Sequence, residues 1–224
     1  MRALLGKELR EVFGIAAAAL GCYLALAASL MGAKLFDWIP GMPNGTNEVP
    51  FTGGGFLSLF VLVSVVFAVA LGFRQSAWES SRGTYLFLLH RPVRRDAVFL
   101  LKLAAGGGVF LACAAAPIVL YGWWASVPGH HAGPFEWPMA KGAVQFALLT
   151  PLLYLGAFLS GLRPARWFGT RLLPLVASAL ALVLLVNLPW LFYLPWWALG
   201  LPLAALYAGL AVTICHVARV RDYA

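Results

Sequence analysis

The sequence predicts an all-α polytopic membrane protein with six transmembrane helices, and three observations lead to this prediction. Hydrophobic residues make up 62% of the 224 positions and charged residues only 11%, which is too little charge to cover a soluble domain of this size. The apolar residues form runs of about the length that crosses a bilayer. The basic residues collect in every second segment between those runs. We therefore interpret residues 1–224 as one transmembrane domain.

The six predicted spans follow one another along the chain without an internal repeat. They cover residues 14–33, 55–73, 98–123, 143–162, 172–187 and 197–217. Four prolines fall inside or near these spans, namely Pro117, Pro151, Pro174 and Pro202. Because neighbouring helices can satisfy the backbone groups that a proline frees inside a membrane, the prolines are compatible with the spans.

Residues 1–13 predict a short amphipathic helix that lies in the inner membrane interface before the first span. One helical face carries the apolar residues Leu5, Leu9, Val12 and Phe13, and the other carries the charged residues Lys7, Glu8, Arg10 and Glu11. An ordinary charged flank of the first span is the alternative interpretation. The apolar run continues past Met31 without a convincing cleavage site, so we expect a retained first helix and not a cleaved signal peptide.

The distribution of Lys and Arg predicts the orientation of the chain. The N-terminus, the 74–102 and 163–171 segments and the C-terminal tail hold fourteen of them, whereas the intervening 34–54, 124–142 and 188–196 loops hold two. Short cytoplasmic loops are the basic ones, so we expect both termini to be cytoplasmic. The protein would lie in a bacterial-type cytoplasmic (inner) membrane. This distribution also explains the net charge of +8 without nucleic acid, which we do not expect as a partner.

The cytoplasmic segment 74–97 contains a candidate docking element. Its apolar stretch from Tyr85 to Leu89 is far too short to span a membrane. Ser80 or Ser81 can cap one or two helical turns there, and Pro92 can end them. A short exposed apolar helix with basic flanks is typical of a surface that binds a partner protein.

The same segment resembles the loop between the second and third helices of ABC-2 type transporter permeases. That loop typically has an acidic residue, Gly-Thr, two leucines, Pro-Val, a basic residue and a later lysine. The matching residues here are Glu79, Arg82-Gly83-Thr84, Leu88-Leu89, Arg91-Pro92-Val93, Arg94-Arg95 and Lys102. The outer hairpin at 188–197 is also similar to the short re-entrant outer helices of that family. His90 departs from the family, in which a small or polar residue is common at this position.

The resemblance implies the membrane subunit of an ABC exporter. Two permease copies, identical or different, would pair in the lipid membrane, and each would receive a separate ABC ATPase subunit. The loop would be the coupling helix. The residues expected to couple to the ATPase are Glu79, Arg82, Gly83, Thr84, Tyr85, Leu86, Leu88, Leu89, Arg91 and Pro92. The chain would hold no cofactor and no metal of its own, since the partner would bind ATP and Mg.

Three further features agree with a permease that does not hydrolyse ATP itself. They are the glycine runs, the cysteines and the polar residues. No Gly-x-x-x-x-Gly-Lys-Ser/Thr motif occurs, and the runs 53–55 and 106–108 lack its lysine and hydroxyl. We interpret these runs as flexible or closely packed helix segments. The cysteines, which are Cys22, Cys113 and Cys215, lie singly in apolar runs and predict no disulfide. Few polar residues lie inside the spans, which favours an apolar or amphipathic cargo such as a lipid, a peptide or a drug-like molecule.

Two other classes of function stay open. An intramembrane enzyme would need a catalytic cluster, and the nearest is His130, His131 and Glu136 in an outer loop. A solvated loop explains those residues better than a metal site does, and His216 has no evident partner in the sequence. A non-transporting membrane anchor or assembly subunit would share the basic loops but would need no docking helix. We expect a permease and no enzymatic activity in this chain.

Overall fold

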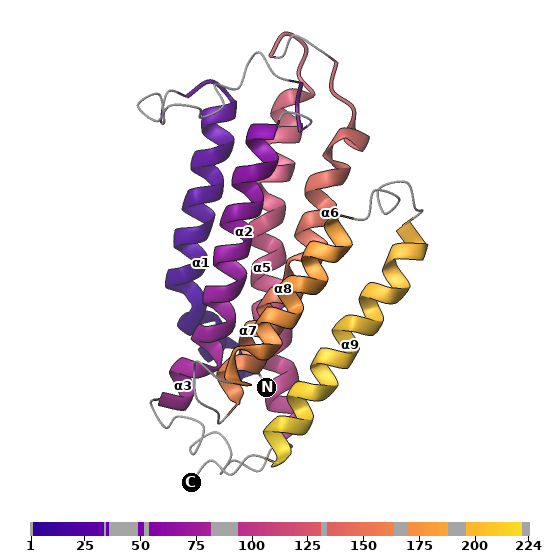
Figure 1. Ribbon diagram of the computed structural model, residues 1–224. Coiled ribbons are helices and arrows are strands. Elements are labelled where there is room, and N and C mark those ends of the chain that lie inside the picture. The colour runs from indigo at the N-terminus through magenta and orange to yellow at the C-terminus, as the bar shows by residue number, and fades with distance from the viewer. Residues whose placement is uncertain are drawn as a thin grey trace. The chain divides into compact units, whose positions relative to one another are not determined.

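The computed structural model describes residues 2–33, 35, 49–51, 54–81, 94–130, 134–163, 170–187 and 196–220. All regular secondary structure in these ranges is helical, and they contain no strand. The helices are α1 (Arg2–Leu30), α2 (Gly54–Gln75), α3 (Ala77–Ser81), α5 (Arg95–Ala125), the 3-10 helix η1 (Trp137–Ala140), α6 (Lys141–Leu149), α7 (Pro151–Leu162), α8 (Leu173–Val186) and α9 (Trp196–Val220) (Figure 1).

Five helical segments in the described ranges are long and apolar enough to cross a membrane, and they indicate an integral membrane protein. They are Leu4–Leu30, Gly55–Glu79, Arg95–Ala125, Trp137–Leu162 and Gly200–Val220. The predicted span at 172–187 is not confirmed, because α8 has only 14 residues. At 1.5 Å per residue α8 is about 21 Å long, shorter than a hydrocarbon core of about 30 Å.

The N-terminal region forms one helix where the sequence predicts two elements. We expected an interfacial helix at 1–13 and a separate span from residue 14, but α1 continues through this point without a break. The chain offers no reason to turn, since Gly14 stands alone and is followed by Ile15 and four alanines, and alanine is the strongest helix former. Whether the first turns lie in the interface stays a prediction.

The chain divides into two compact units, and α7 is the central helix of the first. Unit 1 comprises residues 1–14, 68–109 and 149–224. All twelve residues of α7 are buried, and the helix packs against α3, α8 and α9 (Figure 1). Thr150 and Pro151 separate α6 from α7, and proline is well accommodated at the first position of a helix, where its missing N–H would have no helical partner.

Unit 2, residues 15–67 and 110–148, is held by aromatic packing. The Phe56 ring stacks on Phe60 and on Tyr121, with centroid distances of 5.5 and 5.6 Å. The buried Tyr23 hydroxyl forms a 2.7 Å hydrogen bond with the Ser64 hydroxyl, which satisfies the polar end of an otherwise apolar contact. The core of unit 2 is therefore mostly apolar.

Glycine allows α2 and α7 to approach closely within unit 1. A Cβ atom on Gly72 would lie 2.6 Å from the Tyr154 carbonyl oxygen and 2.9 Å from the Phe158 backbone nitrogen. Backbone atoms cannot move aside as a flexible side chain can. In the 106–108 run only Gly106 is closely packed, next to Gln75 and Tyr154, whereas Gly107 and Gly108 face open space.

We predict that Gly72→Ala lowers the free energy of unfolding by roughly 1–3 kcal/mol, the usual cost of overpacking a filled core. Thermal unfolding of the purified protein in detergent would measure the loss. Gly108→Ala is the matched control, because no atom lies within 4 Å of the Cβ position there. Equal stability of the two variants would contradict the close approach of α2 and α7.

Candidate functional site

A fully buried lysine ion-pairs with two glutamates in unit 1. Lys102 lies in α5, Glu8 in α1 and Glu79 in α3. The Lys102 Nζ atom is 2.7 Å from Glu8 Oε1 and 2.6 Å from Glu79 Oε2. The side chains of Lys102 and Glu8 have no exposed surface and that of Glu79 is 3% exposed. Such short charge-assisted bonds are needed to keep a lysine charged in a place without water.

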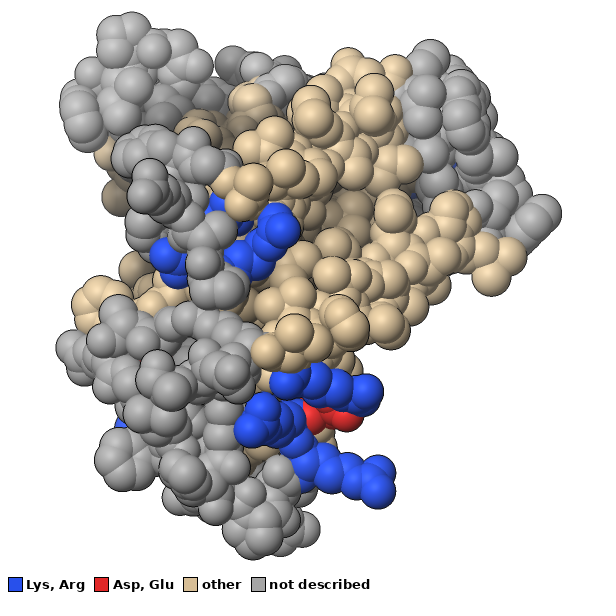
Figure 2. All heavy atoms as spheres, turned by 60° about the horizontal axis from the view of Figure 1, so that its bottom comes forward, with Lys and Arg blue, Asp and Glu red and all other residues tan. Residues whose placement is uncertain are grey.

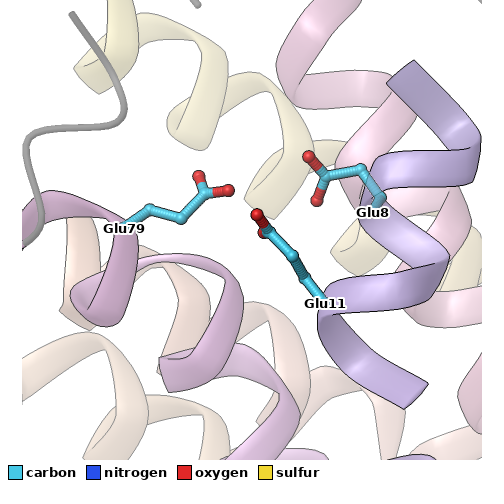
Figure 3. A group of neighbouring side chains, drawn as sticks. All are labelled: Glu8, Glu11 and Glu79. Carbon is cyan, nitrogen blue, oxygen red and sulfur yellow. The ribbon is translucent and has the colours of Figure 1, made fainter. Parts of the chain in front are cut away.

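A second lysine and a third glutamate form the rim of this cluster. Lys7 and Glu11 pair along α1 at 3.3 Å, and Lys7 also reaches Glu79 at 3.4 Å. The side chain of Lys7 is 36% exposed and that of Glu11 is 28% exposed. Figure 3 shows the carboxyl groups of Glu8 and Glu11 from α1 and of Glu79 from α3 pointing toward one another. We call these five residues the charged cluster.

A hydrogen-bonded pair of side chains supports α5 at the charged cluster. The Tyr154 hydroxyl of α7 donates to Gln75 Oε1 of α2 at 2.7 Å. It also lies 3.3 Å from the Lys102 carbonyl oxygen, which accepts a 3.4 Å bond from Gln75 Nε2. The position of Lys102 is thus fixed through its backbone by α2 and α7 and through its ammonium group by α1 and α3.

A metal ion fits this arrangement poorly. Carboxylate oxygens of Glu8, Glu11 and Glu79 lie within 4.8 Å of one another, and carboxylates are ligands that hard cations prefer. The Lys102 ammonium group, however, already lies within hydrogen-bond distance of two of the three carboxylates. The geometry is that of an ion-pair network whose central cation is a side chain.

An exposed ion pair joins the beginning of α5 to the end of α9. Arg219 donates from Nε to Asp96 Oδ1 at 2.7 Å and from a second nitrogen to Oδ2. Arg94 and Arg95 are exposed next to Asp96 in the sequence. In Figure 2 the Lys and Arg side chains gather in separate groups on the displayed face, with a small acidic area beside one of them. This end of unit 1 is basic.

The structure describes only one of the ten residues that the sequence assigns to coupling. Glu79 is buried in the charged cluster, where it contacts Lys7 and Lys102. The other nine, from Arg82 to Pro92, lie outside the described residues. In the outer loop, His130 bonds the Trp124 carbonyl oxygen at 2.9 Å and stacks on the Trp124 ring, while His131 lies outside the described residues.

The sequence does not reveal that Glu8 and Lys102 pair with each other. It placed Glu8 on the solvated face of the first helix, which is wrong: Glu8 is fully buried, whereas Leu9 and Phe13 are 42% and 71% exposed. Glu8 turns inward because its charge is paired with Lys102, and Leu9 and Phe13 can face lipid, whereas Val12 of the predicted apolar face is buried as expected. Lys102, grouped by the sequence with the basic loop, lies about two turns inside α5. Ionisable residues of opposite sign at the ends of apolar runs are the signal that could have revealed them.

We predict that Lys102→Met lowers stability by about 3–5 kcal/mol, because it leaves the Glu8 carboxylate buried without its counter-charge and removes the shortest ion pair of Glu79. The triple variant with Glu8→Gln and Glu79→Gln should recover much of the loss, since no unpaired charge then remains. Thermal unfolding would measure both variants. Arg219→Met is the control: its ion pair with Asp96 is exposed and should contribute little to stability. Equal losses in Lys102→Met and the triple variant would contradict the ion-pair network.

No protein-family model matches the chain, and neither a curated protein nor a solved structure matches it. The resemblance that residues 74–102 show to ABC-2 permeases therefore stays a prediction.

Proposed function

We propose that this chain is the transmembrane subunit of an ATP-driven ABC transporter of the ABC-2 type. It would export a hydrophobic or amphipathic molecule, such as a lipid, a peptide or a drug-like compound. A separate ATPase subunit would hydrolyse the ATP, and a second permease copy would complete the pathway. The helices long enough to cross a membrane and the sequence pattern of the 74–102 segment support this proposal.

The observation that carries the proposal is the ion pair between Glu79 and Lys102. These residues are the first and the last charged positions of the ABC-2-like pattern, and they meet at 2.6 Å although 23 positions separate them. The part of the chain between Glu79 and Lys102 is thereby closed by a direct ion pair between these two residues. Glu8 attaches α1 to Lys102 as well. A force applied to the segment would act on α1, α3 and α5 together.

Such an attachment suits a subunit that receives mechanical work. Buried ion pairs are directional and hold one geometry, so helices joined by them tend to move as a body between discrete arrangements. An ATPase that binds the coupling segment differently in its two nucleotide states would shift the balance between inward-facing and outward-facing forms. An apolar link of the same area would transmit such a force with less fixed geometry.

The contacts within unit 1 also support the predicted orientation. Glu8, near the beginning of α1, reaches Lys102 in the first half of α5, and Arg219, near the end of α9, reaches Asp96 at the beginning of α5. Both ends of the described chain therefore lie at the end of α5 that follows the coupling segment. The excess of Lys and Arg in these segments favours the cytoplasmic side for all of them.

The two alternatives gain no comparable support. An intramembrane enzyme needs a nucleophile or a bound metal, and among the described residues the charged cluster pairs its carboxylates with lysines instead. A membrane anchor would need no attachment of one loop to three helices. Co-purification of an ATPase subunit from native membranes would separate transport from both alternatives.

We predict that Leu86→Asp or Leu89→Asp abolishes cargo-stimulated ATP hydrolysis, because a charge would be buried in the contact with the ATPase. Hydrolysis would be measured on the purified complex in liposomes. Membrane insertion should be unchanged, since the segment lies outside the predicted spans. Leu86→Met and Leu89→Met are the controls and should keep most of the stimulation. Normal coupled transport in the Asp variants would exclude a docking role for 85–89.

We predict that a cysteine at position 84 is protected from a membrane-impermeant maleimide in intact cells, whereas a cysteine at position 46 is labelled. Thr84→Cys and Thr46→Cys would be made in a chain whose three native cysteines are replaced by alanine or serine. Both sites should react after the membrane is permeabilised. Labelling of Thr84→Cys from outside the intact cell would reverse the proposed orientation.

A further inference from the structure

Gln145 of α6 is a buried side chain whose amide group has no hydrogen bond to the described part of the chain. The residue is 5% exposed, and its Oε1 and Nε2 atoms are both buried without a partner. It belongs to unit 2 and to the segment Trp137–Leu162, which is long and apolar enough to cross a membrane. Because Gln145 lies roughly 13 Å from Trp137 along the helical axis, a membrane crossed by this segment would have the amide inside its hydrocarbon layer.

Buried hydroxyl groups of unit 2 do have hydrogen bonds. The Tyr23 and Ser64 hydroxyls bond each other at 2.7 Å, and the Ser29 hydroxyl donates to the Leu26 carbonyl oxygen at 2.9 Å. Lipid and apolar side chains offer no such bond, so an amide left alone among them is strongly unfavourable. Gln145 is therefore an exception to a rule that the rest of unit 2 follows, and such an exception calls for a partner.

The neighbours of Gln145 on α6 cannot supply that partner from their side chains. Ala143, Phe146, Ala147 and Leu149 are all buried and apolar. A glutamine inside a membrane usually bonds a neighbouring helix, but neither atom of this amide bonds any described residue. Both its donors and its acceptor thus stay available to a ligand.

The chemistry of the amide defines the class of ligand. A carboxamide presents one acceptor oxygen and two N–H donors, so it suits a group that can itself both donate and accept. Hydroxyl groups, amide groups and water have this property. The amide carries no charge and could not offset the burial of a charged ligand. The ligand group is therefore uncharged.

We propose that Gln145 is the binding site for one uncharged hydrogen-bonding group in the core of unit 2. The group belongs either to a water molecule or to the hydroxyl or amide of an amphipathic ligand. The inference stands apart from the proposed transport function, because binding at Gln145 can be measured on this chain alone.

Thermal unfolding of the purified full-length protein in detergent tests for the amphipathic ligand. The probe is 1-dodecanol, and dodecane is its matched analogue without a hydroxyl group. If such a ligand fills the site, dodecanol should raise the unfolding temperature of the wild-type protein more than dodecane does. Gln145→Met and Gln145→Leu remove the amide but keep an apolar side chain of similar size, and both should lose this difference. Two variants of different shape are used so that a packing defect in one does not decide the result.

Nuclear magnetic resonance of protein with isotopically labelled glutamine tests for water. A water molecule held by Gln145 should give a cross-peak with its side-chain amide protons, and the two variants identify that cross-peak by losing it. Gln75→Met is the control, because the Gln75 amide is already bonded to Tyr154 and to the Lys102 carbonyl oxygen. It should lower the unfolding temperature without changing the difference between dodecanol and dodecane or the cross-peak of Gln145.

Either signal, if it depends on Gln145, supports the site and identifies the source of the bound group. A wild-type protein that shows neither signal would overturn the proposal. In that case Gln145→Met and Gln145→Leu should both be more stable than the wild type, since each would remove a buried amide that nothing binds.

Discussion

A lysine ammonium group that is fully buried among helices has to be neutralised where it lies, and this requirement governs unit 1. The Lys102 ammonium group can stay charged only because Glu8 and Glu79 approach it to within 2.7 Å. Each partner comes from a different helix, so neutralising one charge fixes α1, α3 and α5 relative to one another. Removal of any of the three leaves a charge that burial makes expensive.

The packing around Lys102 follows from the same constraint. Its carbonyl oxygen is held by Gln75 and Tyr154, and Gly106 leaves the space that these two side chains occupy. One turn earlier on α2, Gly72 lets the backbone of α7 come close. Close backbone contact and buried polar bonds depend on each other here, because short hydrogen bonds require helices that are near and correctly oriented.

The sequence predicts most of the fold because the apolar runs are long and their ends are marked by charge. Five runs appear as helices of spanning length, whereas the run at 172–187 forms a helix of 14 residues. The length of an apolar run sets an upper limit on a helix, but Pro174 at its beginning and Asn187 at its end limit α8 further. Periodicity could not predict that Glu8 points inward, since a partner 94 positions away decides its direction.

The buried site was the least predictable part for a related physical reason. Glu79 and Lys102 belong to the sequence pattern of the 74–102 segment, but Glu8 is one of several charged residues before the first apolar run, where charged flanks are common. Only the three-dimensional arrangement distinguishes a flank from an ion pair. Because Glu8, Glu79 and Lys102 form one ion-pair network, the same contact explains the glutamate at the beginning of the 79–102 pattern and the lysine at its end.

The two units differ in the kind of interaction that holds them, and this difference bears on how the protein could move. Aromatic contacts such as those of Phe56, Phe60 and Tyr121 allow several offset and edge-to-face arrangements, so they can persist while side chains shift. The ion pairs of Lys102 lose most of their energy when distance or angle changes. Conformational change that begins at α3 should therefore leave the charged cluster intact or break it outright, and an intermediate stretched state should be rare.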